Sequence, residues 1–366
     1  MNLYVVVGEE SGDVHAGNLL SSLKKEYSNI NIRGFGGDNM IKAGVDVVQH
    51  IDTLSFMGIT EVIINSWTLY KHIRFCKKDI IRFNPDAILL VDYSGFNLRI
   101  AKFAYEKNIK IFYYIPPKVW AWNKNRLHKI KKYVDELIVI FPFEVEFFKK
   151  YGVNVHYFGN PTLEHIKNIS KSDSDISIQT NKSIISLLPG SRDHEIKENL
   201  PVMIEAAKQF KDYDFIIGAT SRSFHICKKI CKKYNVNFHI LRNETYALLR
   251  RSSAAVITSG TASLEAAFLK IPQIVCYKSD TLTYMTARFF LKIKWISLVN
   301  IVMNKEIVTE LIYSNMNKRR LTLELNKILN KDNKKKILSK YLVLYNKFNL
   351  DDSFYKKISR FFKENL

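Results

Sequence analysis

Short apolar runs alternate with longer amphipathic stretches along the whole chain. The apolar runs are mostly continuous in Val, Ile and Leu, which is the pattern of strands buried on both faces of a parallel sheet. Because these runs alternate with helical stretches, the pattern predicts an α/β fold with two parallel sheets covered by helices. The predicted strands span 3–7, 32–35, 87–91, 110–115, 136–141 and 155–158 in the first half, and 183–188, 214–218, 238–241, 254–258 and 273–277 in the second.

The length and one polar segment predict where the domains divide. A chain of 366 residues suits two domains of roughly 150–200 residues. Residues 168–182 are polar and rich in Ser and Asp, as in a linker. We therefore expect an N-terminal domain over 1–167, a C-terminal domain over 183–340, and a basic helical tail over 341–366 that packs back on the first domain. Since open parallel sheets bind ligands at the carboxyl ends of their strands, functional residues should follow the strands.

Composition narrows the class of protein. The hydrophobic share of 47% is typical of a globular chain. No apolar run approaches the roughly 18 residues of a membrane span. The first residues also lack the basic segment that begins a secretory signal, so we expect a cytoplasmic protein. The net charge of +21 favours nucleic acid, anionic lipid or a phosphorylated partner, although a generic Lys-rich surface also explains it. Cys227 and Cys231 form only one close pair, whereas a zinc site needs two.

Two segments of the first half place polar residues directly after a predicted strand. Residues 8–13, GEESGD, follow the first strand, and their glycines allow a tight turn into a helix. Ser11 or Asp13 could cap that helix, and Ser11 and Gly12 are candidates for binding an acceptor hydroxyl; an ordinary turn is the alternative. Asp92 ends the strand 87–91, where burial would raise the pKa of its carboxyl and suit it to general-base work. The alternative is that Asp92 only caps the next helix.

The segment LPGSR in the second half is suited to phosphate binding. Ser191 and Arg192 follow a strand and open a helix, so that backbone and guanidinium could grip a phosphate together. Glu195 is placed to orient Arg192. An ordinary turn with an exposed arginine is the alternative.

The segment TSGTASLE is a second turn of this kind. Ser259, Gly260 and Thr261 follow a strand and bring backbone N–H groups to a helix N-terminus, which suits a diphosphate. Glu265 lies about one turn further on, where it could accept hydrogen bonds from ribose hydroxyls. A capped helix without a ligand is the alternative. Two such turns and a candidate base describe a nucleotide-sugar transferase better than an NAD enzyme.

The stretch 113–142 combines a strand, an aromatic loop and a basic helix. Trp120 and Trp122 are large rings that are costly to expose, and Arg126 follows them among several lysines. This pattern predicts a groove that meets an anionic, apolar or sugar-containing ligand, with Trp120 and Arg126 as candidates for contacting an acceptor or its phosphate. The alternative is that the rings only fill the core.

Eight stretches, taken together and in order, resemble the lipid-A-disaccharide synthase family. Members of this family are inverting glycosyltransferases of the GT-B architecture. The stretches are GEESGD, GFGGDNM, FMGITEV, PPKVWAWNKNRLHKI, FPFEVEFFKKYGV, LLPGSR, SGTASLE and SLVNIVMNKEIVTEL, over about residues 5 to 312. The resemblance implies two Rossmann-like domains facing a cleft, the first for the acceptor and the second for the UDP-sugar. It also implies that UDP-2,3-diacylglucosamine is joined to 2,3-diacylglucosamine 1-phosphate in a β-1,6 linkage, with release of UDP and without cofactor or metal.

The resemblance also implies roles for individual residues. Asp92 matches the base that deprotonates the acceptor 6-hydroxyl, and Arg192 matches an arginine needed for activity. The nucleotide-binding segments of the family match Ser259, Gly260, Thr261, Glu265, Asn300 and Glu306. The chain departs from the family pattern at Ser94, Gly95, Pro116 and Asn160, and the effect of these departures is left open.

Because both implied substrates carry acyl chains, the enzyme is expected to act at a membrane surface. The resemblance therefore places the protein peripherally on the inner face of the inner membrane, in contact with anionic lipid. Residues 55–83 and 284–302 mix apolar and basic side chains, as interfacial segments do; a core helix with a solvated edge is the alternative for each. The family can also form homodimers through exchange of its C-terminal part.

Two other functions fit parts of the sequence. One is another GT-B enzyme, a transferase or an epimerase that acts on UDP-N-acetylglucosamine. The other is a nucleic-acid-binding protein, since the aromatic and basic residues of 113–133 would allow stacking and phosphate contact. No nucleic-acid-binding motif supports the second, so we expect no nucleic-acid partner.

Overall fold

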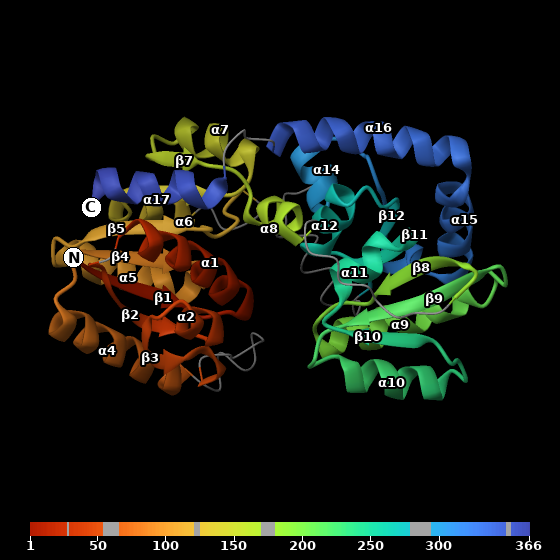
Figure 1. Cartoon of the computed structure of the whole chain (residues 1–366), viewed down its shortest axis with the longest axis horizontal. Coiled ribbons are helices and arrows are strands. Elements are labelled where there is room, and N and C mark those ends of the chain that lie inside the picture. The colour runs from red at the N-terminus through yellow and green to blue at the C-terminus, as the bar shows by residue number, and fades with distance from the viewer. Residues whose placement is uncertain (28, 54–65, 121–124, 170–179, 279–293, 349–352) are drawn as a thin grey trace. The chain divides into compact units, whose positions relative to one another are not determined.

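The chain folds into two compact units (Figure 1), described from a computed structural model that places residues 1–27, 29–53, 66–120, 125–169, 180–278, 294–348 and 353–366. Unit 1 contains Met1–Pro161 together with Leu350–Leu366, and unit 2 contains Thr162–Asn349. The linker predicted at 168–182 falls largely outside the described residues. The tail predicted from residue 341 divides between the units, because α16 (Lys331–Phe348) belongs to unit 2 and α17 (Phe354–Asn365) to unit 1.

Unit 1 is built on a seven-stranded parallel sheet in the order β3-β2-β1-β4-β5-β6-β7. Its strands are β1 (Asn2–Val7), β2 (Asn31–Gly36), β3 (Asp46–His50), β4 (Ala87–Val91), β5 (Lys110–Tyr114), β6 (Glu136–Val139) and β7 (Val155–Tyr157). β1 pairs with β2 on one side and with β4 on the other, so the strand order reverses between β1 and β4. The turns that follow these two strands therefore run to opposite sides of a topological switch point.

Helices cover both faces of this sheet. One face packs on α4 (Ser66–Phe83), α5 (Ser94–Glu106), α6 (Asn125–Tyr133) and α7 (Pro142–Lys150), in a core that includes Tyr4 and Leu90. The other face packs on α1 (Glu10–Glu26), α2 (Asp38–Lys42) and α17, in a core that includes Val5 and Leu89. Successive residues of β1 and β4 thus enter opposite cores, which explains why both strands are apolar at nearly every position.

Helix α17 completes unit 1, although all of unit 2 separates it in sequence from the rest of that unit. It lies beside α1 (Figure 1), and its Phe362 ring stacks on Phe112 of β5 with centroids 4.4 Å apart. The ring of Phe361 packs against the ring of His156 on β7, with centroids 4.3 Å apart. The helix therefore covers the sheet from β5 to β7.

Unit 2 repeats this construction on a six-stranded parallel sheet in the order β10-β9-β8-β11-β12-β13. Its strands are β8 (Ser183–Leu188), β9 (Tyr213–Ala219), β10 (His239–Arg242), β11 (Ser252–Thr258), β12 (Gln273–Tyr277) and β13 (Thr309–Ile312). One face packs on α9 (Asp193–Ala207), α10 (Phe224–Lys233) and α15 (Lys318–Leu329), and the other on α11 (Thr245–Arg250) and α12 (Ala262–Phe268). Helices α14 (Leu298–Met303) and α16 contact α12, and the switch point lies between β8 and β11.

The predicted α/β fold with two parallel sheets is confirmed. The apolar-run pattern does not predict β3 or β13, each of which lies at an edge of its sheet and is mostly only partly buried. An edge strand does not need the continuous apolar run of a central strand. The predicted strand 110–115 ends one residue early, because Ile115 has a φ of +57° in the left-handed region.

Candidate active site

The switch point of unit 1 brings together the turn after β1 and the turn after β4. Val7 and Val91 are paired at the carboxyl ends of these strands. Gly12 lies against this pair, because a Cβ added to it would lie 3.0 Å from Val7 Cγ1 and 3.9 Å from Asp92 Cβ. Open parallel sheets bind ligands at such points. The predicted residues Ser11, Gly12 and Asp92 therefore share one edge of unit 1.

The backbone of Asp92 has a strained conformation held by neighbouring groups. Asp92 and Tyr93 have φ values of +47° and +42°, in the left-handed region that non-glycine residues rarely adopt. The Asp92 N–H donates to the Tyr114 carbonyl at 3.1 Å. Its carbonyl oxygen accepts from the Tyr113 hydroxyl and from Asn97 Nδ2, both at 2.8 Å. These bonds fix the direction in which the carboxylate leaves the strand.

The carboxyl of Asp92 has a raised pKa. Burial is the main cause and the carboxylate of Glu9 adds to it, whereas Lys118 acts in the opposite direction; together they raise the pKa of Asp92 to about 6. A carboxyl of this kind is ionised at neutral pH and still basic enough to take a proton. Glu9 was not among the residues predicted from the sequence, where its signal is an acidic pair directly after the glycine that follows β1.

The first turn of α1 is not capped as predicted. Glu9 is the N-cap residue, and no side chain caps the helix within this fully described segment, so the prediction that Ser11 or Asp13 caps it is wrong. Asp13 is instead buried inside α1, where its carboxylate accepts three backbone N–H groups at the start of α2, the shortest from Gly37 at 2.7 Å. Ser11 remains exposed on the first turn of α1, where a ligand can reach it.

Trp120 fixes the loop after β5 against helix α7. Trp120 Nε1 donates to Glu144 Oε1 of α7 at 2.9 Å, and the Trp120 ring stands edge-on to Phe143 with centroids 5.0 Å apart. Trp120 is only partly buried, so it packs against α7 and still presents surface at the loop. Trp122 lies outside the described residues.

The predicted phosphate candidate Arg126 has a local hydrogen-bond partner, and so do Ser94 and Asn160, two of the departures from the family pattern. Arg126 Nη1 donates to Ser94 Oγ at 2.6 Å, which joins the start of α6 to the start of α5. Gly95 is exposed, with open space where a Cβ would lie. Pro116 is buried in the loop after β5, and the buried Asn160 donates Nδ2–H to the Ile140 carbonyl at 2.9 Å. Ser94 and Asn160 therefore have structural roles in this chain.

The switch point of unit 2 carries the predicted LPGSR turn after β8. Arg192 is the N-cap residue of α9, and its Nη1 lies 3.2 Å from Glu195 Oε1, which confirms the predicted orientation of Arg192 by Glu195. Gly190 has a φ of +112°, and a Cβ there would lie 2.6 Å from the Glu195 carboxylate, so only glycine leaves room for the pair. Ser191 and more than half of the Arg192 side chain stay exposed at this edge.

The turn after β11 lies at the same edge, because β8 and β11 are paired in parallel. The Ser259 hydroxyl donates to the Ile296 carbonyl at 2.8 Å and so holds the segment before α14. Gly260 and Thr261 are exposed at the start of α12. The predicted nucleotide turn therefore has one member with a structural hydrogen bond and two that are open to a ligand.

Glu265 is held by Tyr246, a residue that was not predicted from the sequence. The Tyr246 hydroxyl of α11 is hydrogen-bonded to the Glu265 carboxyl, whose pKa burial raises to about 7. The Tyr246 ring is itself edge-on to His165 of α8 (Pro161–Ile169), with centroids 5.1 Å apart. No spacing in the sequence links these three residues, which come from three helices.

Asn300 and Glu306 have different environments. Asn300 is fully buried, and its side-chain oxygen accepts from the N–H groups of Ile307 (2.7 Å) and Val308 (3.0 Å). Its Nδ2 donates to the Val308 carbonyl at 2.9 Å and to Glu310 Oε1 at 2.8 Å. The amide is thus fully used inside unit 2. Glu306 is exposed directly before the backbone that Asn300 holds.

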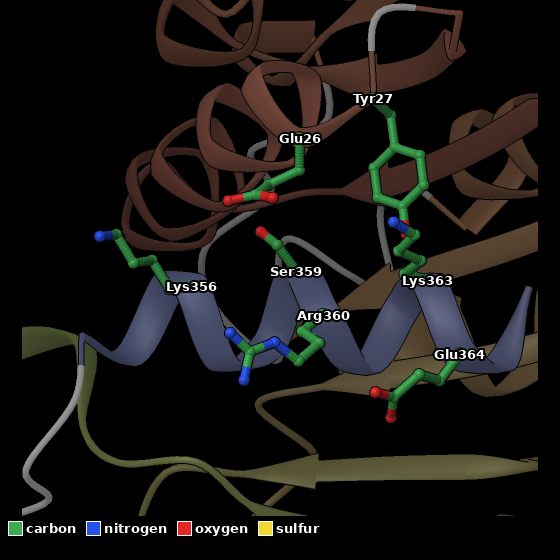
Figure 2. Close-up of a pocket in the computed structure, with 7 residues that line it drawn as sticks. All are labelled: Glu26, Tyr27, Lys356, Ser359, Arg360, Lys363 and Glu364. Atoms are coloured by element: carbon green, nitrogen blue, oxygen red, sulfur yellow. The ribbon is translucent and has the colours of Figure 1, made fainter.

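A pocket of about 420 Å³ lies elsewhere on unit 1, where α17 crosses the end of α1 (Figure 2). Its lining residues are Glu26, Tyr27, Lys356, Ser359, Arg360, Lys363 and Glu364. Glu26 ends α1, whereas the predicted site lies at the start of that helix. A helix of this length spans roughly 25 Å at 1.5 Å per residue, so the pocket is remote from Asp92.

Relatives with curated names match nearly the whole chain. A family model described as lipid-A-disaccharide synthetase matches residues 3–357. The chain is 35% identical over 327 residues to lipid-A-disaccharide synthase 1 of Legionella pneumophila (strain Paris), covering 87% of this chain and 85% of the relative. It is 33% identical over 353 residues to lipid-A-disaccharide synthase of Nitrosococcus oceani, covering 94% and 91%.

Solved structures share the fold at low sequence identity. A UDP-GlcNAc 2-epimerase from Neisseria meningitidis, bound to UDP-GlcNAc, has a TM-score of 0.69 at 12% identity and covers 99% of this chain and 100% of its own. A glycosyltransferase from Rickettsia africae has a TM-score of 0.54 at 16% identity, with 99% and 97% covered. At these identities the likeness supports the architecture alone.

Proposed function

The chain belongs to the lipid-A-disaccharide synthase family, and we propose that it joins UDP-2,3-diacylglucosamine to 2,3-diacylglucosamine 1-phosphate, forming the lipid A disaccharide and UDP. The observation that carries the proposal is the family match over residues 3–357, which includes both units. The alternative of a UDP-N-acetylglucosamine epimerase rests on a shared fold at 12% identity, whereas the named synthases reach 35%.

In the proposed mechanism Asp92 is the general base. Its carboxylate takes the proton of the acceptor 6-hydroxyl while that oxygen bonds to the anomeric carbon of the donor. The bond between this carbon and the diphosphate breaks, and its electron pair leaves on UDP. Attack from the side opposite the leaving group inverts the anomeric configuration. Support comes from the place of Asp92 at a switch point and from burial that raises its pKa to about 6.

We propose that Arg192 and the turn after β11 stabilise the negative charge that develops on the departing UDP. Arg192 is exposed at the start of α9 with Glu195 on one side of its guanidinium, which leaves other N–H groups for a phosphate. Gly260 and Thr261 offer backbone N–H groups, and Glu265 is placed for the ribose. Such groups can stabilise a departing diphosphate without a metal ion. Asn300 acts by holding the backbone after Glu306 and not by touching UDP.

The reaction of the wild-type protein with its two lipid substrates tests the proposal. We expect one UDP released for each disaccharide formed, at the same rate with and without EDTA, because no step uses a metal ion. UDP-N-acetylglucosamine, which carries only a short acetyl group on N2 and a free 3-hydroxyl, should be a much poorer substrate. Conversion of that sugar to its 2-epimer would identify an epimerase instead. A rate that EDTA abolishes and a divalent cation restores would contradict the metal-independent mechanism.

Helix α4 has an exposed face that suits a membrane surface. Within the described residues, no helix has the length and apolarity to cross a bilayer. The exposed residues of α4 lie along one side of the helix and combine three rings, four cations and one aliphatic chain: Trp67, Tyr70, Lys71, Arg74, Phe75, Lys78, Ile81 and Arg82. Trp67 stacks on Tyr70 with centroids 5.7 Å apart, and Lys71 lies over the Trp67 ring. We propose that this face binds anionic headgroups on the cytoplasmic side of the membrane. The other predicted segment, 284–302, lies partly outside the described residues.

We expect the double substitution Trp67→Ser and Tyr70→Ser to weaken binding to phosphatidylglycerol vesicles by roughly tenfold, because it removes the two most exposed rings of this face and keeps the cations. Co-sedimentation with vesicles measures this effect. Tyr105→Ser, which removes an exposed ring from α5, is the matched control and should bind like the wild type. Vesicle binding that is unchanged by the α4 substitutions would place the membrane contact elsewhere.

A further inference from the structure

Glu144 is a buried carboxylate that has no part in the proposed proton transfer or in leaving-group stabilisation. It lies in the first turn of α7 and is 2% exposed. Its Oε2 accepts the Phe141 backbone N–H at 3.2 Å, which caps the start of α7. A carboxylate can cap a helix from an exposed position, where it keeps its hydration. Burial instead raises the pKa of Glu144 to about 7, so the site keeps this group at an energetic cost.

The additional bond that burial permits runs to Trp120. Glu144 Oε1 accepts the Trp120 indole N–H at 2.9 Å, while Phe143 packs edge-on against the same ring. This bond joins the loop after β5 to the start of α7, which follows β6. Trp120 has no other polar atom in its side chain, so Glu144 determines how the indole ring is turned. The ring is only partly buried and still presents surface to a ligand.

The loop that carries Trp120 is adjacent to Asp92. β5 pairs with β4 along its whole length, with Tyr114 opposite Val91, and the Asp92 N–H donates to the Tyr114 carbonyl at 3.1 Å. The loop begins at Ile115, which has a φ of +57°. Lys118, two residues before Trp120, acts electrostatically on the carboxylates of both Asp92 and Glu144. The position of this loop therefore sets the surroundings of the proposed base.

We propose that Glu144 is a positioning residue for the acceptor sugar, which it serves by fixing the indole of Trp120 at the edge of the sheet next to Asp92. The inference rests on the proposed function, since it assigns the acceptor to this edge of unit 1. Glu144 itself touches neither substrate. Its removal should weaken acceptor binding and leave the donor half of the reaction unchanged.

Steady-state kinetics of Glu144→Gln and Trp120→Phe test the proposal. Gln keeps the size of the side chain but cannot accept all of its N–H bonds, and Phe keeps a ring without the N–H. We expect each substitution to raise the acceptor KM by roughly tenfold, in line with loss of a hydrogen bond to a charged group. The KM of the UDP-sugar and kcat should stay within about threefold of the wild type. The double variant should be no worse than either single variant, because both substitutions act through the contact between Trp120 and Glu144.

Glu146→Gln is the matched control, since Glu146 is exposed on the same helix, and it should have wild-type kinetics. Three results would overturn the proposal: an unchanged acceptor KM in Trp120→Phe, equal rises in both KM values, or effects of the two substitutions that multiply. If Glu144→Gln does not fold, Trp120→Phe decides alone. If the wild type releases no UDP, the proposed function is refuted. The acceptor KM of a variant relative to that of the wild type tests only the positioning role of Glu144.

Discussion

Asp92→Asn is expected to reduce UDP release from the two lipid substrates by about 10²- to 10⁴-fold, the usual contribution of a general base. Asparagine has nearly the same size as aspartate, and the bonds that hold this residue involve its backbone N–H and carbonyl, so the turn should keep its shape. The amide, however, cannot take a proton from the acceptor hydroxyl. Turnover assays at saturating substrate measure the loss, and calorimetric titration with UDP should show unchanged binding.

The pH dependence of the wild type provides an independent measurement of the same residue. Because Asp92 must be ionised to act and burial raises its pKa to about 6, kcat/KM should fall as the pH drops through about 6 and be constant above it. Asp52→Asn, at an exposed carboxylate of unit 1, is the control and should retain both rate and profile. Near-normal turnover in Asp92→Asn would exclude Asp92 as the base.

Phe362→Ala is expected to lower the free energy of unfolding of unit 1 by about 3–5 kcal/mol, the usual cost of truncating a buried phenylalanine. Phe362 is fully buried, and its ring stacks on Phe112 at 4.4 Å between centroids. The close-packed sheet cannot move to fill the space that the ring leaves. Since a chain of two units need not unfold in one step, hydrogen exchange at the β5 amides under mild urea is the suitable measurement.

Lys356→Ala is the control for this experiment, because Lys356 is exposed on the same helix. It should change the stability by no more than about 0.5 kcal/mol. Equal protection of the β5 amides in Phe362→Ala and in the wild type would show that α17 does not contribute to the folded unit 1 in solution.

The central strands and the residues that follow them could be predicted from the sequence, because both depend on local patterns. A strand buried on both faces must be apolar throughout, and a turn at its carboxyl end must hold the glycines, hydroxyls and charges of a site, as Asp92 and Arg192 do. The edge strands β3 and β13 could not be predicted in this way, because they are mostly only partly buried and polar residues interrupt their short apolar runs. The pairs Trp120–Glu144 and Tyr246–Glu265 join separate elements, and no sequence spacing encodes such a contact.

The order of the two units along the chain has a consequence for synthesis. Residues 1–161 leave the ribosome first, but α17, which covers Phe112 and its neighbours, is translated only after all of unit 2. At a translation rate of about 5–20 residues per second, the delay is roughly 10–40 s. During this interval the nascent sheet of unit 1 lacks part of its apolar cover, whereas unit 2 is released with its elements complete. The newborn N-terminal half is therefore the part of this protein that a chaperone is expected to bind.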